Sequence, residues 1–199
     1  MTLDRLRPLA DRLLDPFVRA TKATGLTPDA VSALAFLLAV GAGLSFYQAR
    51  PGWYLLGAAL VFLNGWLDLL DGALARELAT DSAAGDLLDH VLDRYADVIV
   101  VAGLAGGIGQ YALGFAAVTG VLLTSYLGTQ IEAVGLEREY GGLLGRADRL
   151  ALIGFVGVLM PIVPAIGEVS LVAILLVFLA AVGHLTAIQR FVAGFRELR

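Results

Sequence analysis

Four aspartates in two closely spaced pairs carry the chemistry that this sequence suggests. Asp68 and Asp71 lie three residues apart, and Asp89 and Asp93 lie four residues apart, in segments that are otherwise mostly apolar. At about 100° per residue, the members of each pair share one face of a helix, and two such faces on adjacent helices can converge. Because an unpaired carboxylate in a membrane is costly, we expect these side chains to face a polar cavity.

Converging carboxylates repel one another unless cations lie between them. Ligand sets made only of oxygen suit Mg²⁺, Mn²⁺ or Ca²⁺. Near a membrane surface, we expect such ions to neutralise the charge of a phosphate or diphosphate during displacement. A single aspartate could instead pair with Arg76 or Arg94 or relay protons, and Asp97 is interpreted as a partner for Arg94. The four aspartates together favour a metal site.

The elements that position these pairs are predicted to be membrane-spanning helices. Hydrophobic residues make up 58% of the 199 residues, and the mean hydropathy is +0.81, which is typical of multi-span membrane proteins. A crossing needs about 20 mostly apolar residues. The sequence therefore predicts an all-α integral membrane protein with six transmembrane helices, at about 30–49, 53–75, 86–104, 111–131, 150–167 and 169–189.

The distribution of basic residues orients these helices. With six crossings, all 14 Lys and Arg residues except Arg50 fall on the same side. Because cytoplasmic segments hold the excess of Lys and Arg, we expect a multi-pass protein of the cell membrane with both termini in the cytoplasm. The aspartates then lie near the cytoplasmic face.

Residues 1–27 alternate charged and apolar side chains at helical spacing and lack the apolar centre and cleavage site of a signal peptide. We interpret this segment as an amphipathic juxtamembrane helix; the alternative is a soluble cap on the bundle. No boundary divides residues 1–199, so one domain is predicted. The absence of cysteine excludes disulfides and thiol nucleophiles, and a net charge of only −4 indicates no nucleic-acid partner.

The full spacing around the aspartates is Asp68-x-x-Asp71-Gly72-x-x-Ala75-Arg76, then eight residues, then Gly85-x-x-x-Asp89-x-x-x-Asp93. This pattern resembles the signature of the CDP-alcohol phosphotransferase family. The stretch GLTPDAVS at 25–32 is similar to the start of that family's first helix, with Asp29 where Asn is frequent. The resemblance implies transfer of a phosphoalkyl group from a CDP-linked donor to an alcohol, with release of CMP.

Carried over to this chain, the resemblance implies roles for particular residues. Two divalent ions, Mg²⁺ or alternatively Mn²⁺, would be held by Asp68, Asp71 and Asp89, with Asp93 close enough to contribute. Asp93 would also act as the catalytic general base. The cytidine nucleotide would bind along Gly72, Ala75, Arg76 and Gly85. The resemblance also implies a homodimer and a role in phospholipid synthesis.

The acceptor is suggested by a narrower resemblance, to the branch that makes phosphatidylinositol phosphate or archaetidylinositol phosphate. The stretches GGLLGRADRLALI at 141–153 and AIQR at 187–190 resemble that branch, and they place Arg146, Arg149 and Arg190 at the phosphate of the acceptor. Gly128 and Gln130 stand where the branch usually has Lys and Arg. Inositol phosphate and glycerol phosphate therefore both remain candidate acceptors, and the arginines could instead anchor helix ends in the cytoplasm.

The lipid donor is predicted to be CDP-diacylglycerol or CDP-archaeol, and the sequence does not choose between them. The alternative function is a transporter that binds a cation through its intramembrane aspartates. That alternative would place the acids near the middle of the bilayer and gives no reason for the glycines at the family's spacing. A prenyltransferase would usually need DDxxD clusters, and the sequence contains none.

Overall fold

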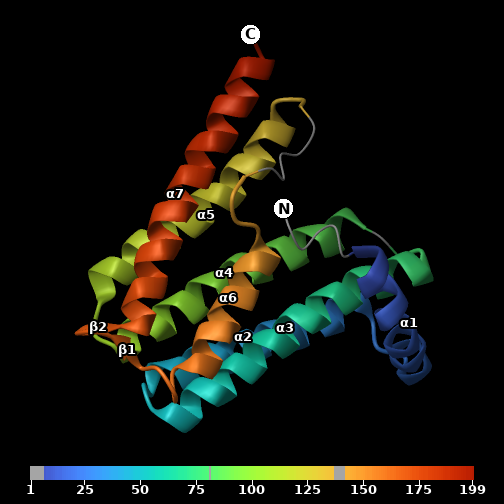
Figure 1. The fold of residues 1–199 in the computed structure, drawn as a ribbon. Helices are drawn as coiled ribbons and strands as arrows, with labels where there is room; N and C mark the ends of the chain where they lie inside the picture. Colours follow the sequence, from blue (N-terminus) through green and yellow to red (C-terminus); the bar gives the residue numbers. More distant parts are fainter. Residues whose placement is uncertain (1–6, 81, 137–141) are drawn as a thin grey trace.

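A computed structural model of the chain describes residues 7–80, 82–136 and 142–199, which form an all-α bundle (Figure 1). The described residues contain seven helices and one short antiparallel hairpin of β1 and β2. In chain order the elements are α1 (Arg7–Thr24), α2 (Pro28–Tyr47), α3 (Pro51–Leu78), α4 (Ala83–Gly107), α5 (Tyr111–Ala133), α6 (Arg146–Leu159), β1 (Ala165–Ile166), β2 (Val169–Ser170) and α7 (Leu171–Glu197).

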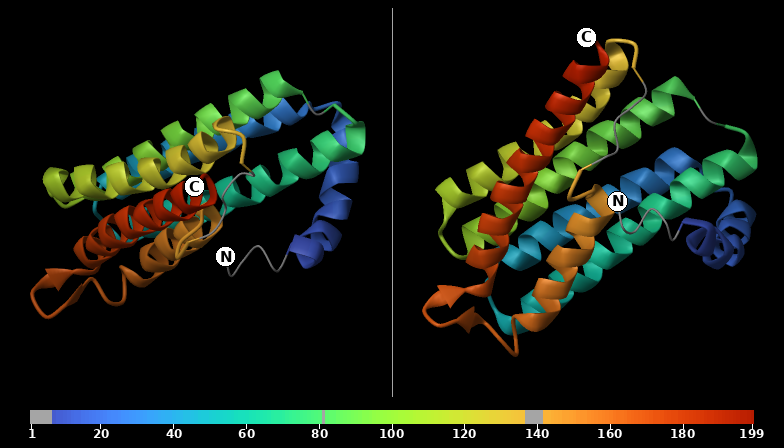
Figure 2. Two further views of the ribbon diagram at one scale, coloured as in Figure 1. Left: turned by 90° about the horizontal axis from the view of Figure 1, so that it is seen from above. Right: turned by 45° about the horizontal axis from the view of Figure 1, so that its top comes forward.

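Successive helices from α2 to α7 run in alternating directions (Figures 1 and 2). This alternation places the starts of α2, α4 and α6 towards the same side of the bundle as the ends of α3, α5 and α7. Helix α4 packs between α2 and α5, while α3 packs on α2 and α6, and α7 packs on α5. The last turns of α3, the first turns of α4 and the start of α6 therefore meet, and the predicted aspartates lie there.

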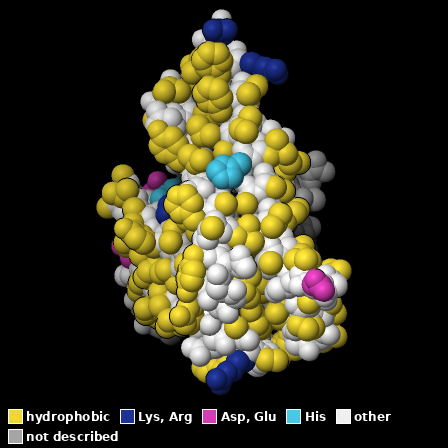
Figure 3. Space-filling view, turned by 90° about the vertical axis from the view of Figure 1, so that its left-hand side faces the viewer, with side chains coloured by type: hydrophobic (Ala, Val, Ile, Leu, Met, Phe, Trp, Pro, Cys, Tyr) yellow, Lys and Arg dark blue, Asp and Glu magenta, His cyan; other side chains and the backbone are white. Residues whose placement is uncertain are grey.

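Four helices in the described part of the chain, α2, α3, α5 and α7, are long and apolar enough to cross a membrane. Figure 3 shows a face of the molecule that is mostly hydrophobic between Lys and Arg side chains at its top and bottom. Helix α4 carries the charged stripe of the aspartates, and α6 has only 14 residues. The structure thus supports a membrane protein, and the expectation of six crossings stays a prediction.

The predicted extent of the fifth helix, 150–167, is wrong at both ends. Helix α6 begins earlier, at Arg146, and it ends at Leu159, so that the hairpin occupies the end of the predicted span. Pro161 explains the early end, because proline lacks the N–H that a helix interior needs. Met160, the residue before it, still has helical φ and ψ. The predicted turn at 106–110 is confirmed, since α4 ends at Gly107 and α5 begins at Tyr111.

Helix α1 lies at a steep angle to the long helices, beside the last third of α3 (Figures 1 and 2). Its buried residues Leu14 and Val18 pack against apolar side chains of α3, whereas Leu13 and Phe17 remain exposed. Lys22 Nζ pairs with Glu77 Oε1 at 3.0 Å. The predicted amphipathic helix is thus present and attached to the bundle. Residues 1–6 of the predicted segment lie outside the described residues. Arg138, one of the basic residues used to predict the orientation, also lies outside them.

The approach of α2 to α4 depends on two glycines. A Cβ added to Gly103 would collide with the backbone carbonyl of Gly43, and one added to Gly43 would lie 2.6 Å from the carbonyl oxygen of Ile99. Small residues permit this backbone-to-backbone contact. As a result α2 and α4 run close together along their length, and the first turns of both helices reach the same site.

Candidate functional site

Three of the four predicted aspartates form one cluster. Asp68 of α3 and Asp89 and Asp93 of α4 each offer a carboxylate oxygen, and these oxygens all lie within 4.8 Å of one another. All three side chains are partly buried. A compact set of carboxylate oxygens is the ligand chemistry that hard divalent cations such as Mg²⁺ and Mn²⁺ take, so these residues fit a metal ion.

The short connection between α3 and α4 brings the two helices to this geometry. Helix α3 ends in a Schellman motif: Ala79 adopts a left-handed conformation with φ of 51°, and Thr80 N–H donates to the carbonyl of Ala75 at 3.1 Å. Helix α4 then begins at once, because the Ser82 hydroxyl accepts a hydrogen bond from Gly85 N–H at 3.0 Å. The tight reversal places the end of α3 beside the start of α4.

Arg146, the first residue of α6, bridges the two aspartate helices. Its Nη1 lies 2.6 Å from Asp68 Oδ1, and its Nη2 lies 2.6 Å from Asp93 Oδ1. The start of α6 is stabilised by Asp148, whose carboxylate accepts a hydrogen bond from Gly145 N–H at 3.1 Å. A guanidinium fixed in this way offers planar donors suited to carboxylate or phosphate oxygens. Arg146 therefore borders the carboxylate cluster directly.

A buried ionic network lies behind Arg146. Arg149 Nη2 donates to Asp97 Oδ2 at 2.9 Å, and both side chains are about 95% buried, with exposed fractions of 4% and 5%. Arg94 lies 3.6 Å from the same carboxylate and also donates to the hydroxyl of Ser125. The predicted pairing of Arg94 with Asp97 is thus confirmed, but Arg149 is the closer partner. The sequence signal for Asp97 was its position four residues after Asp93 on the same helix face.

The three predicted acceptor arginines have different surroundings. Arg146 contacts the carboxylate cluster, and Arg149 is buried against Asp97. Arg190 is buried where α7 packs on α5, and its Nη1 donates to the carbonyl of Thr124 at 2.7 Å. The geometry therefore distinguishes Arg146, which lies at the site, from Arg149, which lies in the network behind it.

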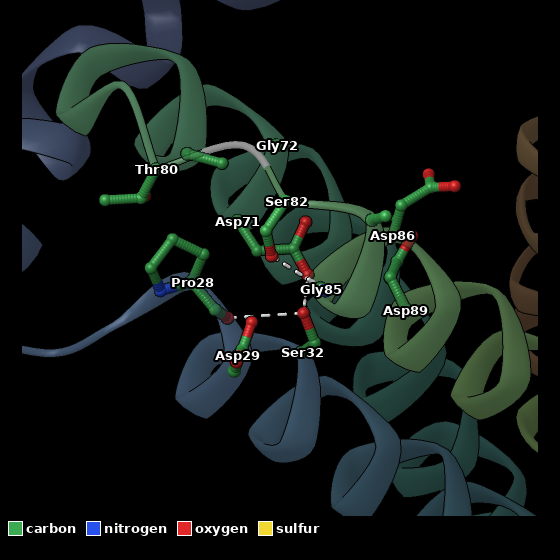
Figure 4. Close-up of a pocket in the computed structure, with 12 residues that line it drawn as sticks. Pro28, Asp29, Ser32, Asp71, Gly72, Thr80, Ser82, Gly85, Asp86 and Asp89 are labelled. Carbon is green, nitrogen blue, oxygen red and sulfur yellow. Dashed lines mark hydrogen bonds between the residues drawn. The ribbon is translucent and has the colours of Figure 1, made fainter.

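A cavity of about 460 Å³ opens between the starts of α2 and α4 and the end of α3 (Figure 4). Three residues predicted to bind the nucleotide line it, namely Gly72, Ala75 and Gly85, together with Asp71 and Asp89. Arg76 is not among the described residues that line this cavity; its Nη1 lies 3.4 Å from the point where a Cβ of Gly72 would be. The lack of side chains on the glycines leaves room for a ligand beside the backbone.

Asp71 lies in this cavity rather than in the three-carboxylate cluster. Its Oδ2 accepts a hydrogen bond of 2.6 Å from the hydroxyl of Ser32 on α2, as Figure 4 shows. The cavity connects Asp71 to the cluster because Asp89 belongs to both. Sequence reasoning gave Ser32 no role, and the available signal was a hydroxyl within the otherwise apolar run of 30–40.

Comparisons with known proteins identify the family of this chain. Residues 25–187 match the family model of CDP-alcohol phosphatidyltransferases. The chain is 32% identical to archaetidylinositol phosphate synthase from Methanothermobacter thermautotrophicus, over 99% of this chain and 96% of that protein. It is 33% identical to phosphatidylinositol phosphate synthase from Streptomyces avermitilis, over 96% of this chain and 81% of that protein.

The fold is also shared with a solved structure. Phosphatidylinositol phosphate synthase from Mycobacterium tuberculosis with CDP-DAG bound superposes with a TM-score of 0.78 and 27% identity, over 92% of this chain and 94% of that one. A second structure of that enzyme, in complex with manganese and citrate, has the same TM-score with 26% identity, over 92% of this chain and 88% of that one. The signature aspartates, the fold and the family match together show that the chain belongs to the CDP-alcohol phosphatidyltransferase family.

Proposed function

We propose that this protein transfers a phosphatidyl or archaetidyl group from a CDP-linked lipid to a polyol phosphate and releases CMP. The observation that carries the proposal is the cluster of Asp68, Asp89 and Asp93, which adjoins a cavity lined by small residues and is bordered by Arg146. Such an arrangement suits a diphosphate substrate better than an ion in transit. The alternative of a cation transporter is not favoured, because the chain belongs to a family of transferases.

In the proposed reaction, Gly72, Ala75 and Gly85 line the space for the cytidine nucleotide, with Arg76 beside Gly72. Two divalent ions, Mg²⁺ or Mn²⁺, held by the four signature aspartates, would neutralise the negative charge of the diphosphate. Asp93 takes the proton from the acceptor hydroxyl, whose oxygen forms a bond to the phosphorus that carries the lipid. The bond from that phosphorus to the bridging oxygen breaks, and CMP leaves with the bridging oxygen.

We propose inositol phosphate as the acceptor, with glycerol phosphate as the alternative. The names of the relatives from M. thermautotrophicus and S. avermitilis, which match nearly all of this chain, support inositol phosphate. Arg146 is positioned to bind the phosphate of either acceptor. Arg190 is proposed as a second phosphate ligand, while Arg149 supports Arg146 through Asp97.

The proposal also covers the membrane topology and the oligomeric state of the enzyme. We infer a multi-pass protein of the cell membrane with six crossings and cytoplasmic termini, which places the site near the cytoplasmic face. The distribution of Lys and Arg supports this orientation. A homodimer is proposed from the family resemblance.

The function is tested by CMP release from the purified protein with Mg²⁺. CDP-diacylglycerol and CDP-archaeol are supplied as donors, and inositol phosphate, glycerol phosphate, free inositol and serine as separate acceptors. We expect release that depends on inositol phosphate, with a much lower rate for the unphosphorylated inositol because it lacks the phosphate that Arg146 is proposed to bind. If the protein binds Mg²⁺ but releases no CMP with any donor–acceptor pair, the proposed transferase activity is contradicted. That result would favour the cation transporter.

Arg146→Ala is expected to raise the KM for the acceptor more than the KM for the donor. The guanidinium of Arg146 lies against both Asp68 and Asp93, beside the proposed place of the acceptor. Its removal therefore takes away the proposed ligand for the phosphate of the acceptor. Steady-state kinetics with each substrate varied in turn give the two values. Arg50→Ala, at the start of α3 and the opposite end of that helix from Asp68, is the control. An equal rise in both KM values would contradict the role in acceptor binding.

A further inference from the structure

Ser32 makes a buried contact with one of the signature aspartates. Its hydroxyl lies on α2 and donates to Asp71 Oδ2 on α3 at 2.6 Å, across the packed interface of the two helices. Both side chains are buried, and both line the cavity. The hydrogen bond therefore joins the first turns of α2 to the signature motif within the proposed substrate site.

The geometry shows which acceptor takes the single hydroxyl hydrogen of Ser32. The backbone carbonyl of Pro28 also lies within reach of the same hydroxyl, but at 3.2 Å. An O–H group bound to a carboxylate forms a shorter and stronger hydrogen bond, at about 2.5–2.7 Å, than one bound to a neutral carbonyl. The distance of 2.6 Å to Asp71 falls in that range, so the carboxylate is the main acceptor.

This hydrogen bond restrains a rotation that is otherwise soft. The terminal torsion of an aspartate is broad, so its two oxygens exchange orientation easily. With Oδ2 bound to Ser32, the other oxygen of Asp71 is directed away from Ser32, as Figure 4 shows. A fixed oxygen on the cavity wall can serve as a ligand without a further loss of side-chain freedom.

We propose that Ser32 is a positioning residue that orients Asp71 to bind a divalent metal ion. The proposal rests on the metal-dependent function proposed above and extends it to a residue outside the signature motif. Hydrogen bonds from outer groups commonly orient metal ligands in this way, and their loss weakens metal affinity by about 10–100-fold. Ser32 itself does not contact the reacting atoms in this assignment.

The test is the affinity of the purified full-length protein for Mn²⁺, measured by electron paramagnetic resonance in the absence of substrate. Ser32→Ala should weaken Mn²⁺ binding by about 10–100-fold, and Ser32→Thr, which keeps the hydroxyl, should restore most of the affinity. Ser45→Ala is the matched control, because Ser45 is also buried on α2 but donates only to the backbone carbonyl of Gly41, at 2.7 Å. That control should bind Mn²⁺ as the unmodified protein does.

A merely structural role for Ser32 gives a different pattern. Ser32→Ala would then lower the melting temperature without changing Mn²⁺ affinity, and that result would overturn the proposal. In an Asp71→Asn background, the further change Ser32→Ala should cost no additional Mn²⁺ affinity, because Ser32 acts through Asp71. An additional loss of affinity in that background would also count against it.

The remaining outcomes separate a failure of the role of Ser32 from a failure of the proposed function. If Ser32→Ala does not fold, Ser32→Cys replaces it, since a thiol is a weaker donor, and unchanged Mn²⁺ affinity in that variant would overturn the role of Ser32. If the unmodified protein binds no Mn²⁺, the metal site of the proposed function fails and the role of Ser32 fails with it. Normal binding by the unmodified protein and by Ser32→Ala overturns the role of Ser32 alone.

Discussion

Asp93→Asn is expected to abolish CMP release while leaving most of the binding of the CDP-linked lipid intact. Asp93 lies in the carboxylate cluster and against Arg146 Nη2, beside the place proposed for the acceptor. Asparagine keeps the size of the side chain but cannot take a proton. General bases contribute about 10²–10⁴-fold to a rate, so turnover should fall by at least that range.

Three measurements separate the possible roles of Asp93. CMP release reports turnover, equilibrium binding of the CDP-linked lipid reports the donor site, and Mn²⁺ affinity reports the metal site. Glu77→Gln is the control, because Glu77 is an exposed acid of α3 whose partner is Lys22 on α1. Unchanged turnover would remove Asp93 from the role of base. Loss of lipid and Mn²⁺ binding together with turnover would show that Asp93 acts as a metal ligand and not as the base.

Asp97→Ala is expected to lower the free energy of unfolding by about 3–5 kcal/mol, the usual cost of breaking a buried ion pair from one side. Arg149 and Arg146 both face the Asp97 carboxylate, at 2.9 and 4.0 Å, and Arg94 lies 3.6 Å from it. Without Asp97, these guanidinium groups repel one another with little water to screen them. Denaturation of the protein in detergent micelles measures the loss.

The double variant Asp97→Ala with Arg149→Ala removes both charges of the buried pair. Its loss in the free energy of unfolding should therefore be smaller than the sum of the losses in the two single variants. Lys22→Ala provides the contrast. The pair of Lys22 with Glu77 is about half exposed on each side, so its loss should cost at most about 1 kcal/mol. Equal costs for Asp97→Ala and Lys22→Ala would show that the buried network does not stabilise the fold.

The two aspartate pairs could be predicted because helical spacing is a local property, whereas the cluster of Asp68 with Asp89 and Asp93 depends on how α3 packs beside α4. Residues three or four apart share a helix face in any surroundings, so the pairs at Asp68 and at Asp89 followed from the sequence alone. The glycine-rich turn at 106–110 is local in the same sense. The end of α6 at Leu159 was missed because a hydropathy pattern continued past it, although Pro161 carried the signal.

The sequence by itself determined which residues carry charge, where they lie on each helix and to which family the pattern belongs. Only the tertiary structure decided their partners: Ser32 with Asp71, 39 residues apart, and Arg149 with Asp97, 52 residues apart. The tertiary structure also placed Arg146 between Asp68 and Asp93 and buried Arg149 behind it. The physical reason is that periodicity fixes the face of one helix, whereas the contact between two faces depends on how closely all the helices pack, as at Gly43 and Gly103.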